Sequence, residues 1–321
     1  MSTKEELLNL FEQNKGIYLS GEEIADSLDI SRTAVWKAVN SLRNDGYDID
    51  AQKTKGYCLS PMTDIVSAQG VNKYLRASLD VEVYDEVVST NTMLRERALN
   101  GAKEGLVIIA NSQTGGKGRL GRKFFSPLDT GVYISILLRP ENIEPQKALK
   151  MTTIAAVAAC RSIEGVTDRK AQIKWVNDIF MDGLKVAGIL TEASISMETG
   201  NLEHAIVGIG FNVYEPDGGF PEELKTIAGS ILKEKMPDAK NRIAAEFLNV
   251  FKEIYDDLDA STYYEEYKER CFVIGKDVNV ITPVSTKRAK VLDVTSDCAL
   301  DVIYEDGTRS LLSTGEVSIR T

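Results

Sequence analysis

The sequence contains a single histidine, His204, among 321 residues. One imidazole cannot build a multi-histidine zinc site, and it leaves almost no room for a Ser-His-Asp triad or for phosphotransfer through histidine. We assign His204 no functional role. An enzyme with this composition is expected to rely on lysine, arginine, backbone amides and a hard metal ion.

Cysteines and long apolar runs are also scarce. The four cysteines lie far apart and form no CxxC pair, which excludes a zinc ribbon and a disulfide framework. No apolar run approaches the roughly 18 residues of a membrane helix, and the N-terminus lacks the apolar core of a signal peptide. We therefore expect a cytoplasmic protein with reduced thiols and no contact with membranes.

The remaining composition is that of a globular protein. Hydrophobic residues make up 43% and charged residues 27%, with only 8 prolines. The length of 321 residues predicts two or three domains. The net charge of −10 argues against a surface that binds nucleic acid or anionic lipid everywhere, although it permits local basic patches.

The first 60 residues have the pattern of a winged helix-turn-helix. An amphipathic segment covers residues 4–14, Ser20 and Glu23 form a capping box for a second helix, and Ser31 can cap a third. Residues 47–59 alternate around a Lys- and Gly-containing turn, which predicts a β-hairpin wing. Two short helices followed by a wing are typical of a domain that reads DNA.

The predicted DNA contacts are Arg32, Thr33, Lys37, Asn40, Lys53 and Lys55. Residues 31–57 contain five basic side chains, Arg43 included, against three acidic ones. If all five touched phosphates, log K would fall with log[salt] at a slope of about −4.5 per subunit. The alternative is a three-helix module for protein contacts, in which the basic residues are merely solvated.

The centre of the sequence mixes strands and helices. Expected strands cover residues 105–111, 131–138, 171–175, 179–195 and 203–213, and an Ala-rich helix covers residues 148–164. The Asp182-Gly183 pair predicts a tight hairpin within the fourth of these strands. This order indicates an α+β domain with a largely antiparallel or mixed sheet.

A glycine-rich basic loop lies between the first two of these strands. Residues 113–123 contain four glycines, four basic residues and no acid. The loop matches G-x-G-x-x-G, but Pro127 and its neighbours resist the helix that a dinucleotide fold requires, and the Walker A spacing fails at Asn111. What remains is a loop that can surround a phosphate with amides and cations. The alternatives are a mobile surface loop or an RNA-binding segment.

Three polar clusters accompany this loop. Ser89, Thr90 and Asn91 can cap a helix or contact a small ligand, and capping is the commoner use. Residues 174–178 (KWVND) end in Asp178, which could orient a substrate or bind a metal ion. Lys185 begins an apolar strand, where a lysine usually reaches solvent but could instead point into a pocket.

Together these motifs resemble the biotin protein ligases, specifically the bifunctional type that also represses biotin synthesis genes. The resemblance runs along nearly the whole chain: KTKGYCLS from residue 53, STN from 89, Gln113, GKGRLGRKFFSP from 116, KWVND from 174, LKVAGIL from 184, GIGFNV from 208 and GEVSIR from 315. Three positions depart from the family pattern. Lys117 stands where arginine is common, Phe124 where tryptophan is common, and Val176 where proline is usual.

The resemblance implies a two-step reaction. Biotin and ATP form biotinyl-5′-AMP with Mg²⁺, and a lysine of a carboxylase's biotin carboxyl carrier domain then accepts the biotinyl group. The implied catalytic residues are Lys185, Arg119 and Asp178. Implied biotin contacts are Ser89, Thr90, Asn91, Gln113, Lys117, Gly118, Arg119 and Lys185; implied nucleotide contacts are Arg122, Phe124, Lys174, Asn177 and Asn212, with Gly208 and Gly210 at the pocket wall. The metal ligands stay unspecified.

The resemblance also implies three domains. These are a winged helix at residues 1–64, a class II synthetase-like mixed sheet with helices at 65–270, and an SH3-like β-barrel at 271–321. The adenylate would order the basic loop and promote a homodimer that binds operator DNA. Two alternatives stay open: a lipoate-type acyl ligase, and a ligand-sensing transcription factor without ligase activity.

Overall fold

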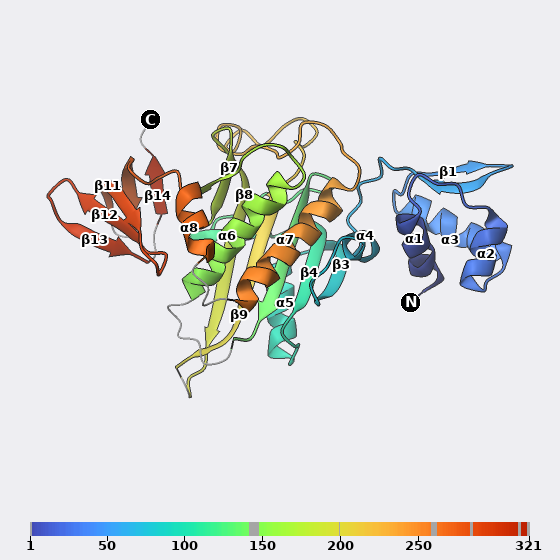
Figure 1. Cartoon of the computed structure of the whole chain (residues 1–321), viewed down its shortest axis with the longest axis horizontal. Coiled ribbons are helices and arrows are strands. Elements are labelled where there is room, and N and C mark those ends of the chain that lie inside the picture. Colours follow the sequence, from blue (N-terminus) through green and yellow to red (C-terminus); the bar gives the residue numbers. More distant parts are fainter. Residues whose placement is uncertain are drawn as a thin grey trace.

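The computed structural model describes residues 2–140, 148–198, 200–257, 262–282, 285–313 and 316–319. It shows an N-terminal helical domain, a central sheet covered by helices and a strand-rich C-terminal domain, arranged in a row (Figure 1). In the described part of the chain, no helix has both the length and the apolar character needed to cross a membrane. The ends of the GEVSIR motif, Gly315 and Arg320, lie outside the described residues.

The N-terminal domain is the predicted winged helix-turn-helix. Its elements are α1 (Thr3–Gln13), α2 (Gly21–Leu28), α3 (Arg32–Asn44), β1 (Ile49–Gln52) and β2 (Gly56–Leu59). Ser20 and Glu23 form the expected capping box, and the Ser31 side chain accepts from the Ala34 amide. The apolar stripes of the three helices meet in a core of their own, which includes Phe11 and Leu42. Local sequence signals were therefore enough to predict this domain.

The central domain is built on a seven-stranded sheet, which is mixed and largely antiparallel, as expected. The strands follow the order β3-β4-β5-β9-β8-β7-β6, with only β3 and β4 parallel. Their bounds are β3 (Asp80–Val87), β4 (Leu106–Gln113), β5 (Gly131–Leu138), β6 (Gln172–Lys174), β7 (Asp178–Met181), β8 (Leu184–Ile195) and β9 (Leu202–Asn212). The helices are α4 (Ala68–Asn72), α5 (Thr90–Leu99), α6 (Ala148–Glu164), α7 (Ala239–Asp256) and α8 (Thr262–Arg270).

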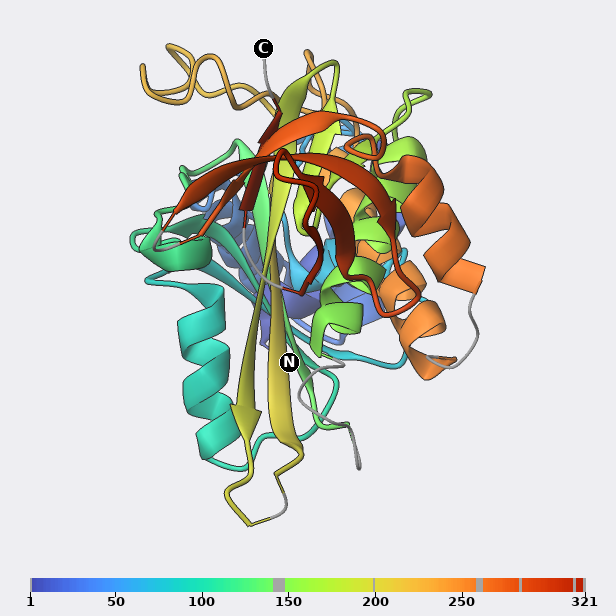
Figure 2. The same cartoon turned by 90° about the vertical axis from the view of Figure 1, so that its left-hand side faces the viewer.

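The two faces of this sheet are covered unequally. Helices α6 and α7 lie on one face, and α5 lies on the other (Figure 2). Side chains alternate along β9, so Val207, Ile209 and Phe211 join the core under α6 and α7. Gly208 and Gly210 face the opposite side. Because α5 covers only part of that side, the glycines leave space for a ligand.

The C-terminal domain is a five-stranded antiparallel sheet that corresponds to the predicted SH3-like region. Its strands are β10 (Asp277–Ile281), β11 (Thr286–Val294), β12 (Leu300–Tyr304), β13 (Arg309–Leu312) and β14 (Glu316–Ile319), in the order β13-β12-β11-β10-β14. The indole Nε1 of Trp175 donates to the Cys298 carbonyl across the boundary, 3.0 Å away. The apolar core also continues from the central sheet into this domain. The two domains are thus packed as one body.

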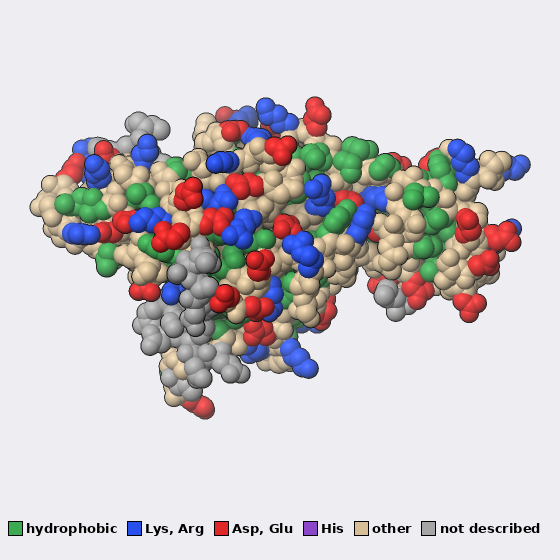
Figure 3. All heavy atoms as spheres, viewed as in Figure 1, with side chains coloured by type: hydrophobic (Ala, Val, Ile, Leu, Met, Phe, Trp, Pro, Cys, Tyr) green, Lys and Arg blue, Asp and Glu red, His purple; other side chains and the backbone are tan. Residues whose placement is uncertain are grey.

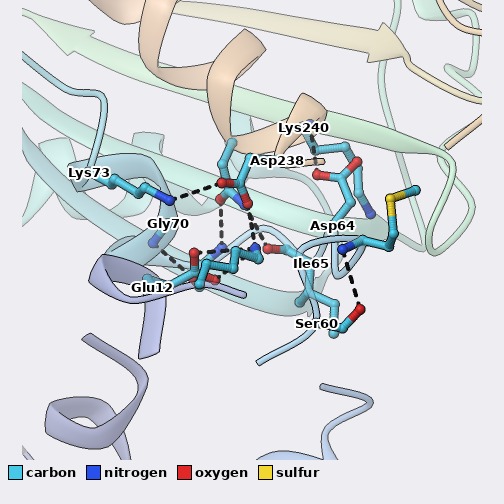
Figure 4. A network of polar contacts seen from close by, with 12 residues as sticks. Glu12, Ser60, Asp64, Ile65, Gly70, Lys73, Asp238 and Lys240 are labelled. Carbon is cyan, nitrogen blue, oxygen red and sulfur yellow. Dashed lines mark hydrogen bonds and ion pairs between the residues drawn. The ribbon is translucent and has the colours of Figure 1, made fainter. Parts of the chain in front are cut away.

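The N-terminal domain is attached differently, through a buried polar joint (Figure 4). The Lys15 ammonium, on the loop after α1, lies between the carboxylates of Glu12 and Asp238. Lys73 and the Tyr74 hydroxyl also contact Asp238, at 3.1 and 2.6 Å. The side chains of Lys15 and Asp238 are each only 6% exposed, so this ion pair is held away from solvent.

The pKa values of the two acids in this joint shift in opposite directions. Burial raises the pKa of Glu12 above its usual value. Burial also acts to raise the pKa of Asp238, but hydrogen bonds from Lys15 and Tyr74 and the nearby positive charge outweigh it and hold that pKa below its usual value. Asp238 is therefore the anion around which the joint is assembled.

A second set of contacts fixes the segment that connects the two domains. Asp64 accepts hydrogen bonds from the Lys240 amide at 3.0 Å and from the Tyr214 hydroxyl at 2.6 Å. The Asn241 side chain donates to the Ile65 carbonyl at 2.9 Å and accepts from the Ser67 amide. The connection is consequently bound to the first turn of α7.

Candidate active site

The uncovered face of the central sheet contains a cavity of about 480 Å³. Its walls come from residues 117–125, from β7 and β8, and from residues 220–228. A compartment of only about 30 Å³ adjoins it at the start of α5. Phe124, Lys117, Gly188 and Leu190 line both spaces. The site therefore has a large and a small part that meet at Phe124.

The small compartment is lined by a connected polar network. Ser89 caps α5 by accepting from the Thr92 amide, and it also lines the compartment, so the capping interpretation is confirmed. The Thr90 amide donates to Gln113 Oε1 at 2.9 Å. The Ser135 hydroxyl lies 2.7 Å from Thr90 Oγ1 and 2.6 Å from Asn91 Oδ1. Such a network can bind a neutral ring that carries both donors and acceptors.

Ser135 was not among the predicted site residues. It is the one polar member of the strand GVYISILL apart from its tyrosine, and it is fully buried. A lone hydroxyl in a buried strand needs a hydrogen-bond partner, so this serine within an otherwise apolar sequence was a usable signal.

Glycines on β9 keep the compartment open. A Cβ at Gly208 would lie 2.0 Å from Asn91 Oδ1, and a Cβ at Gly210 would lie 2.4 Å from the Phe124 ring. Asn91 is held in place by donating to Glu192 Oε2 at 2.8 Å. The two positions thus require glycine for steric reasons, since neither has a positive φ.

The large compartment is strongly cationic. Asp178 is the one carboxylate among its described lining residues. Five cationic side chains line it: Lys117, Arg119, Arg122, Lys123 and Lys185. The Lys185 ammonium pairs with Asp178 at 2.6 Å, and Arg119 donates to Asn177 Oδ1 at 2.9 Å. This arrangement suits a polyanionic ligand such as a nucleoside triphosphate.

The hairpin between β7 and β8 produces the Lys185–Asp178 pair. Asp182 and Gly183 both have positive φ, at +49° and +80°, as the Asp-Gly signal predicts. Because the hairpin folds β8 back along β7, the lysine returns next to the carboxylate. The four-residue strand β7 and the tight turn thereby place Asp178 and Lys185 side by side.

The glycine-rich loop folds over the site without forming an α-helix. The Gly118 amide donates to the Arg122 carbonyl at 2.7 Å, and the Phe124 amide donates to the Gly116 carbonyl at 2.9 Å. Arg119–Gly121 form a single 3₁₀ turn, with positive φ at Leu120 and Gly121. The sequence-based rejection of a dinucleotide fold is confirmed. That the loop orders only over an adenylate stays a prediction.

Two predicted nucleotide contacts lie in different places. Asn212 lines the large compartment and donates to the Gly229 carbonyl at 3.2 Å. Lys174 lines neither compartment, and its ammonium lies 5.9 Å from the centre of the Phe180 ring. The apolar wall formed by Phe220, Leu224 and Ile227 was not predicted, because its irregular segment has no periodic pattern.

The thiols and the imidazole take no part in this site. All four cysteines are free and buried. Burial raises the pKa of Cys160 and of Cys271 to about 12, so neither thiol ionises near neutral pH. His204 is buried on β9, where burial lowers its pKa. The cationic groups and Asp178 are the chemically competent side chains.

The predicted DNA-contacting residues lie on one helix and one hairpin. Arg32, Thr33 and Lys37 are exposed on α3, and Asn40 is half-buried there. Lys53 and Lys55 are exposed between β1 and β2, and basic side chains stand at the tip of this wing in Figure 3.

Two of the basic side chains on α3 have protein partners. Arg43 donates twice to the Ile49 carbonyl, at 3.0 and 2.6 Å, and so fastens α3 to the wing. Arg32 forms an exposed ion pair with Glu22 on α2 at 2.7 Å. We therefore assign Arg43 a structural role, which leaves four of the five counted cations as the predicted phosphate contacts.

Comparisons with known proteins agree with this geometry. The profile of the Biotin/lipoate A/B protein ligase family matches residues 84–212, and an HTH domain profile matches residues 3–58. The biotin protein ligase of Aquifex aeolicus, solved with biotin and ATP, superposes with a TM-score of 0.63 over 75% of this chain and 98% of that chain. At 24% identity, that likeness shows the fold alone.

Curated relatives extend the match to the whole chain. The chain is 33% identical to the bifunctional ligase/repressor BirA of Bacillus spizizenii over 322 residues, which is 97% of each chain. It is 38% identical to the Bacillus subtilis protein of the same name over 231 residues, or 71% of this chain and 70% of that protein. The chain therefore belongs to the bifunctional biotin protein ligases, which join a biotin ligase to a helix-turn-helix repressor domain.

Proposed function

We propose that this chain activates biotin with ATP, transfers it to a lysine of a carboxylase carrier domain, and represses biotin synthesis genes when biotinyl-5′-AMP is bound. One observation carries the ligase half of the proposal. A small polar compartment opens directly into a cavity lined by five cations. Biotin has a neutral ureido ring at one end and a carboxylate at the other, so it matches this polarity.

The ureido ring is assigned to the small compartment. Its carbonyl and two N–H groups would meet Ser89, Thr90, Asn91 and Gln113, with Ser135 supporting them from β5. The apolar chain would pass Gly188 and Leu190, which line both compartments. The carboxylate would then arrive in the cationic cavity.

The compartment must widen before biotin enters. A space of about 30 Å³ holds a water molecule or two but not a bicyclic ring. The Phe124 ring, which packs over Gly210 and edge-on against Tyr133, fills the remaining space. Movement of Phe124 off the sheet is therefore assigned to biotin binding, and the ring would then cover the bound ligand.

The large cavity is assigned to ATP. In the first step a biotin carboxylate oxygen attacks the α-phosphorus, the bond to the pyrophosphate oxygen breaks, and pyrophosphate leaves. Lys185 would hold the carboxylate and the α-phosphate together, with Asp178 fixing its ammonium. Lys117, Gly118, Arg119 and Arg122 would surround the phosphates, and Asn177, Asn212 and Phe124 would contact the rest of the nucleotide.

Mg²⁺ fits this site only as a partner of the phosphates. The described residues hold no group of three acidic, histidine or cysteine side chains that could bind a metal ion by themselves. A single carboxylate, Asp178, with the Asn177 amide beside it, suits an ion held mainly by phosphate oxygens. When bound, the ion would neutralise charge on the pyrophosphate.

In the second step the amine of the carrier lysine attacks the carbonyl carbon of the mixed anhydride. An amide bond forms, the bond to the phosphate oxygen breaks, the amine nitrogen releases a proton to solvent, and AMP leaves with its charge facing the same cations. The loop over the cavity would keep water from this anhydride meanwhile.

The repressor half rests on the winged helix and on family membership. Biotinyl-5′-AMP would promote a homodimer, and two winged helices would then contact a two-fold operator. Sedimentation with and without biotin and ATP tests this coupling. Identical assembly in both conditions would show that the dimer does not depend on the adenylate.

The ligase half is tested by labelling a carrier domain with biotin. Lys185→Ala should lower kcat/KM by about 10²- to 10³-fold, since it removes one charge aimed at the reacting groups. Pyrophosphate release with biotin, but not with lipoate, should accompany activity. Equal labelling by the parent and Lys185→Ala proteins would refute the role of Lys185. Absence of pyrophosphate release from the parent would identify a ligand-sensing protein without ligase activity.

A further inference from the structure

Trp36 is an unexplained feature of α3. Its side chain is 57% exposed, while Val35 and Val39 on the same helix are buried. It lies one turn after Thr33 and one turn before Asn40, on the side of α3 that faces away from the domain core. Among the described residues, its indole takes part in no aromatic pair and no cation–π contact.

The charges around Trp36 indicate what kind of partner covers it. Helix α3 carries three cations and no acid, whereas α1 and α2 each carry three acids. An exposed tryptophan on the one basic helix of an acidic domain suits a polyanion rather than a typical protein surface. Acidic side chains gather at the outer end of the domain, over α2 (Figure 3).

We propose that Trp36 contacts thymine methyl groups in the major groove of the operator and so contributes base preference. The inference rests on the proposed DNA-binding function of α3. An uncharged indole gains little from phosphate. The thymine methyl is the apolar group that base edges present in the major groove, where α3 would lie.

This contact has a measurable signature. An apolar contact releases no counterions, so its loss leaves the salt dependence of binding unchanged. Trp36→Ala should therefore weaken operator binding by about 10- to 100-fold while keeping the slope of log K against log[salt]. Affinity for unrelated DNA should stay within about twofold, because non-specific binding is set by the phosphate contacts. Lys37→Ala should instead weaken binding to the operator and to unrelated DNA, and it should reduce the slope of log K against log[salt].

The experiment uses the full chain with biotin and ATP, and a duplex that the parent selects from a random-sequence pool. Each thymine of that duplex is replaced in turn by deoxyuracil, which removes only the methyl group. At one or more positions, replacing thymine by deoxyuracil should lower the affinity of the parent about tenfold and leave the affinity of Trp36→Ala unchanged. The loss measured for Trp36→Phe should be intermediate.

Fluorescence gives an independent measurement. The chain has two tryptophans, and Trp175 is only 3% exposed. Acrylamide should quench Trp36 in the free protein and lose access to it on the selected duplex. Trp36→Phe should abolish this change while leaving ligase labelling intact.

Four outcomes overturn the inference. Trp36→Ala could bind the selected duplex as the parent does, deoxyuracil could affect both proteins equally, or Trp36→Ala could lose all DNA binding together with its folded N-terminal domain. Trp36→Ala could also lose adenylate-dependent dimerisation while acrylamide still quenches Trp36 of the DNA-bound parent, which would assign the indole to a protein interface. If the parent selects no duplex, the proposed DNA-binding function fails as well.

Discussion

At the residue scale, Gly210 controls how much space the active site has. Gly210→Ala would place a Cβ 2.4 Å from the Phe124 ring, on the surface that biotin needs. We expect kcat/KM for biotin to fall by about 100-fold or more, in line with the cost of misplacing reacting groups. Steady-state rates of carrier-domain labelling at varied biotin concentration measure this kcat/KM.

Gly21→Ala is the matched control. Gly21 begins α2 without a positive φ, and an added Cβ there would meet Tyr57 at an ordinary 3.8 Å. Its ligase kinetics should equal those of the parent. An unimpaired Gly210→Ala enzyme would show that Phe124 and the sheet can separate enough to hold both the new methyl group and biotin.

His204 should make stability depend on pH even though it has no place in catalysis. Burial lowers its pKa below 6.5, so the unfolded chain binds the proton more readily. Its contribution to stability is complete above pH 6.5 and is lost as the pH falls through the lower folded pKa. The urea midpoint of the parent should fall from pH 7 to pH 5 relative to that of His204→Leu. Parallel midpoints across this range would contradict the prediction.

At the element scale, local patterns predicted the regular parts of the fold well. The bounds of β5 and α6 match the expected 131–138 and 148–164, and the Asp182-Gly183 turn was read directly from its two residues. Strand β3 was missed, because acids occupy several of its positions and its only buried residue is Val87. Helices α7 and α8 were not predicted either, although α7 carries a regular apolar face that includes Ile243, Phe247 and Phe251. For β3, local periodicity fails because neither face of the strand is consistently apolar.

The site was predicted in part for the same reason. Motif residues such as Gln113, Arg119 and Lys185 do line the two compartments. Phe220 reaches the site only because a distant loop converges on it, so no local spacing identifies it. The lone serine of β5 indicates that Ser135 needs a hydrogen-bond partner, but not that this partner is Thr90. Arg43 shows what a count of charges leaves out. The count included it among the cations that could touch phosphate, and the structure adds that its guanidinium donates to the Ile49 carbonyl.

The winged helix should therefore show a smaller salt dependence than the charge count implied. Four available cations predict a slope of log K against log[salt] of about −3.6 per subunit instead of −4.5. Lys53→Ala should reduce its magnitude by about 0.9, while Arg43→Ala should leave the slope unchanged even if the fold is weakened. Titrations of labelled duplex from low to high salt measure the slope. An equal decrease in the magnitude of the slope for Lys53→Ala and Arg43→Ala would show that Arg43 also contacts phosphate.

At the scale of the whole molecule, the buried joint should hold the N-terminal domain in one orientation. Asp238→Asn would leave the Lys15 ammonium, 6% exposed, with the Glu12 carboxylate but without that of Asp238. Breaking a buried pair in this way costs about 3–5 kcal/mol. The urea midpoint should fall, and proteolysis within residues 60–67 should accelerate. Asp26→Asn, an exposed acid on α2, is the control and should change neither measurement. Unchanged proteolysis of Asp238→Asn would mean that the remaining contacts, including those of Asp64 and Asn241, are enough to fix the domain.

The same joint limits how freely the two activities can be separated by protein engineering. Lys15 is supplied by one domain and Asp238 by the other, so each half contains charges that the other half neutralises. A ligase domain truncated at residue 64 would expose Asp238 without Lys15. The isolated N-terminal domain would expose Glu12 and Lys15 on its surface. A foreign DNA-binding domain fused to this enzyme would therefore need a cation at the position of Lys15 to pair with Asp238. The two domains are held together by this buried ion pair as well as by the connecting chain.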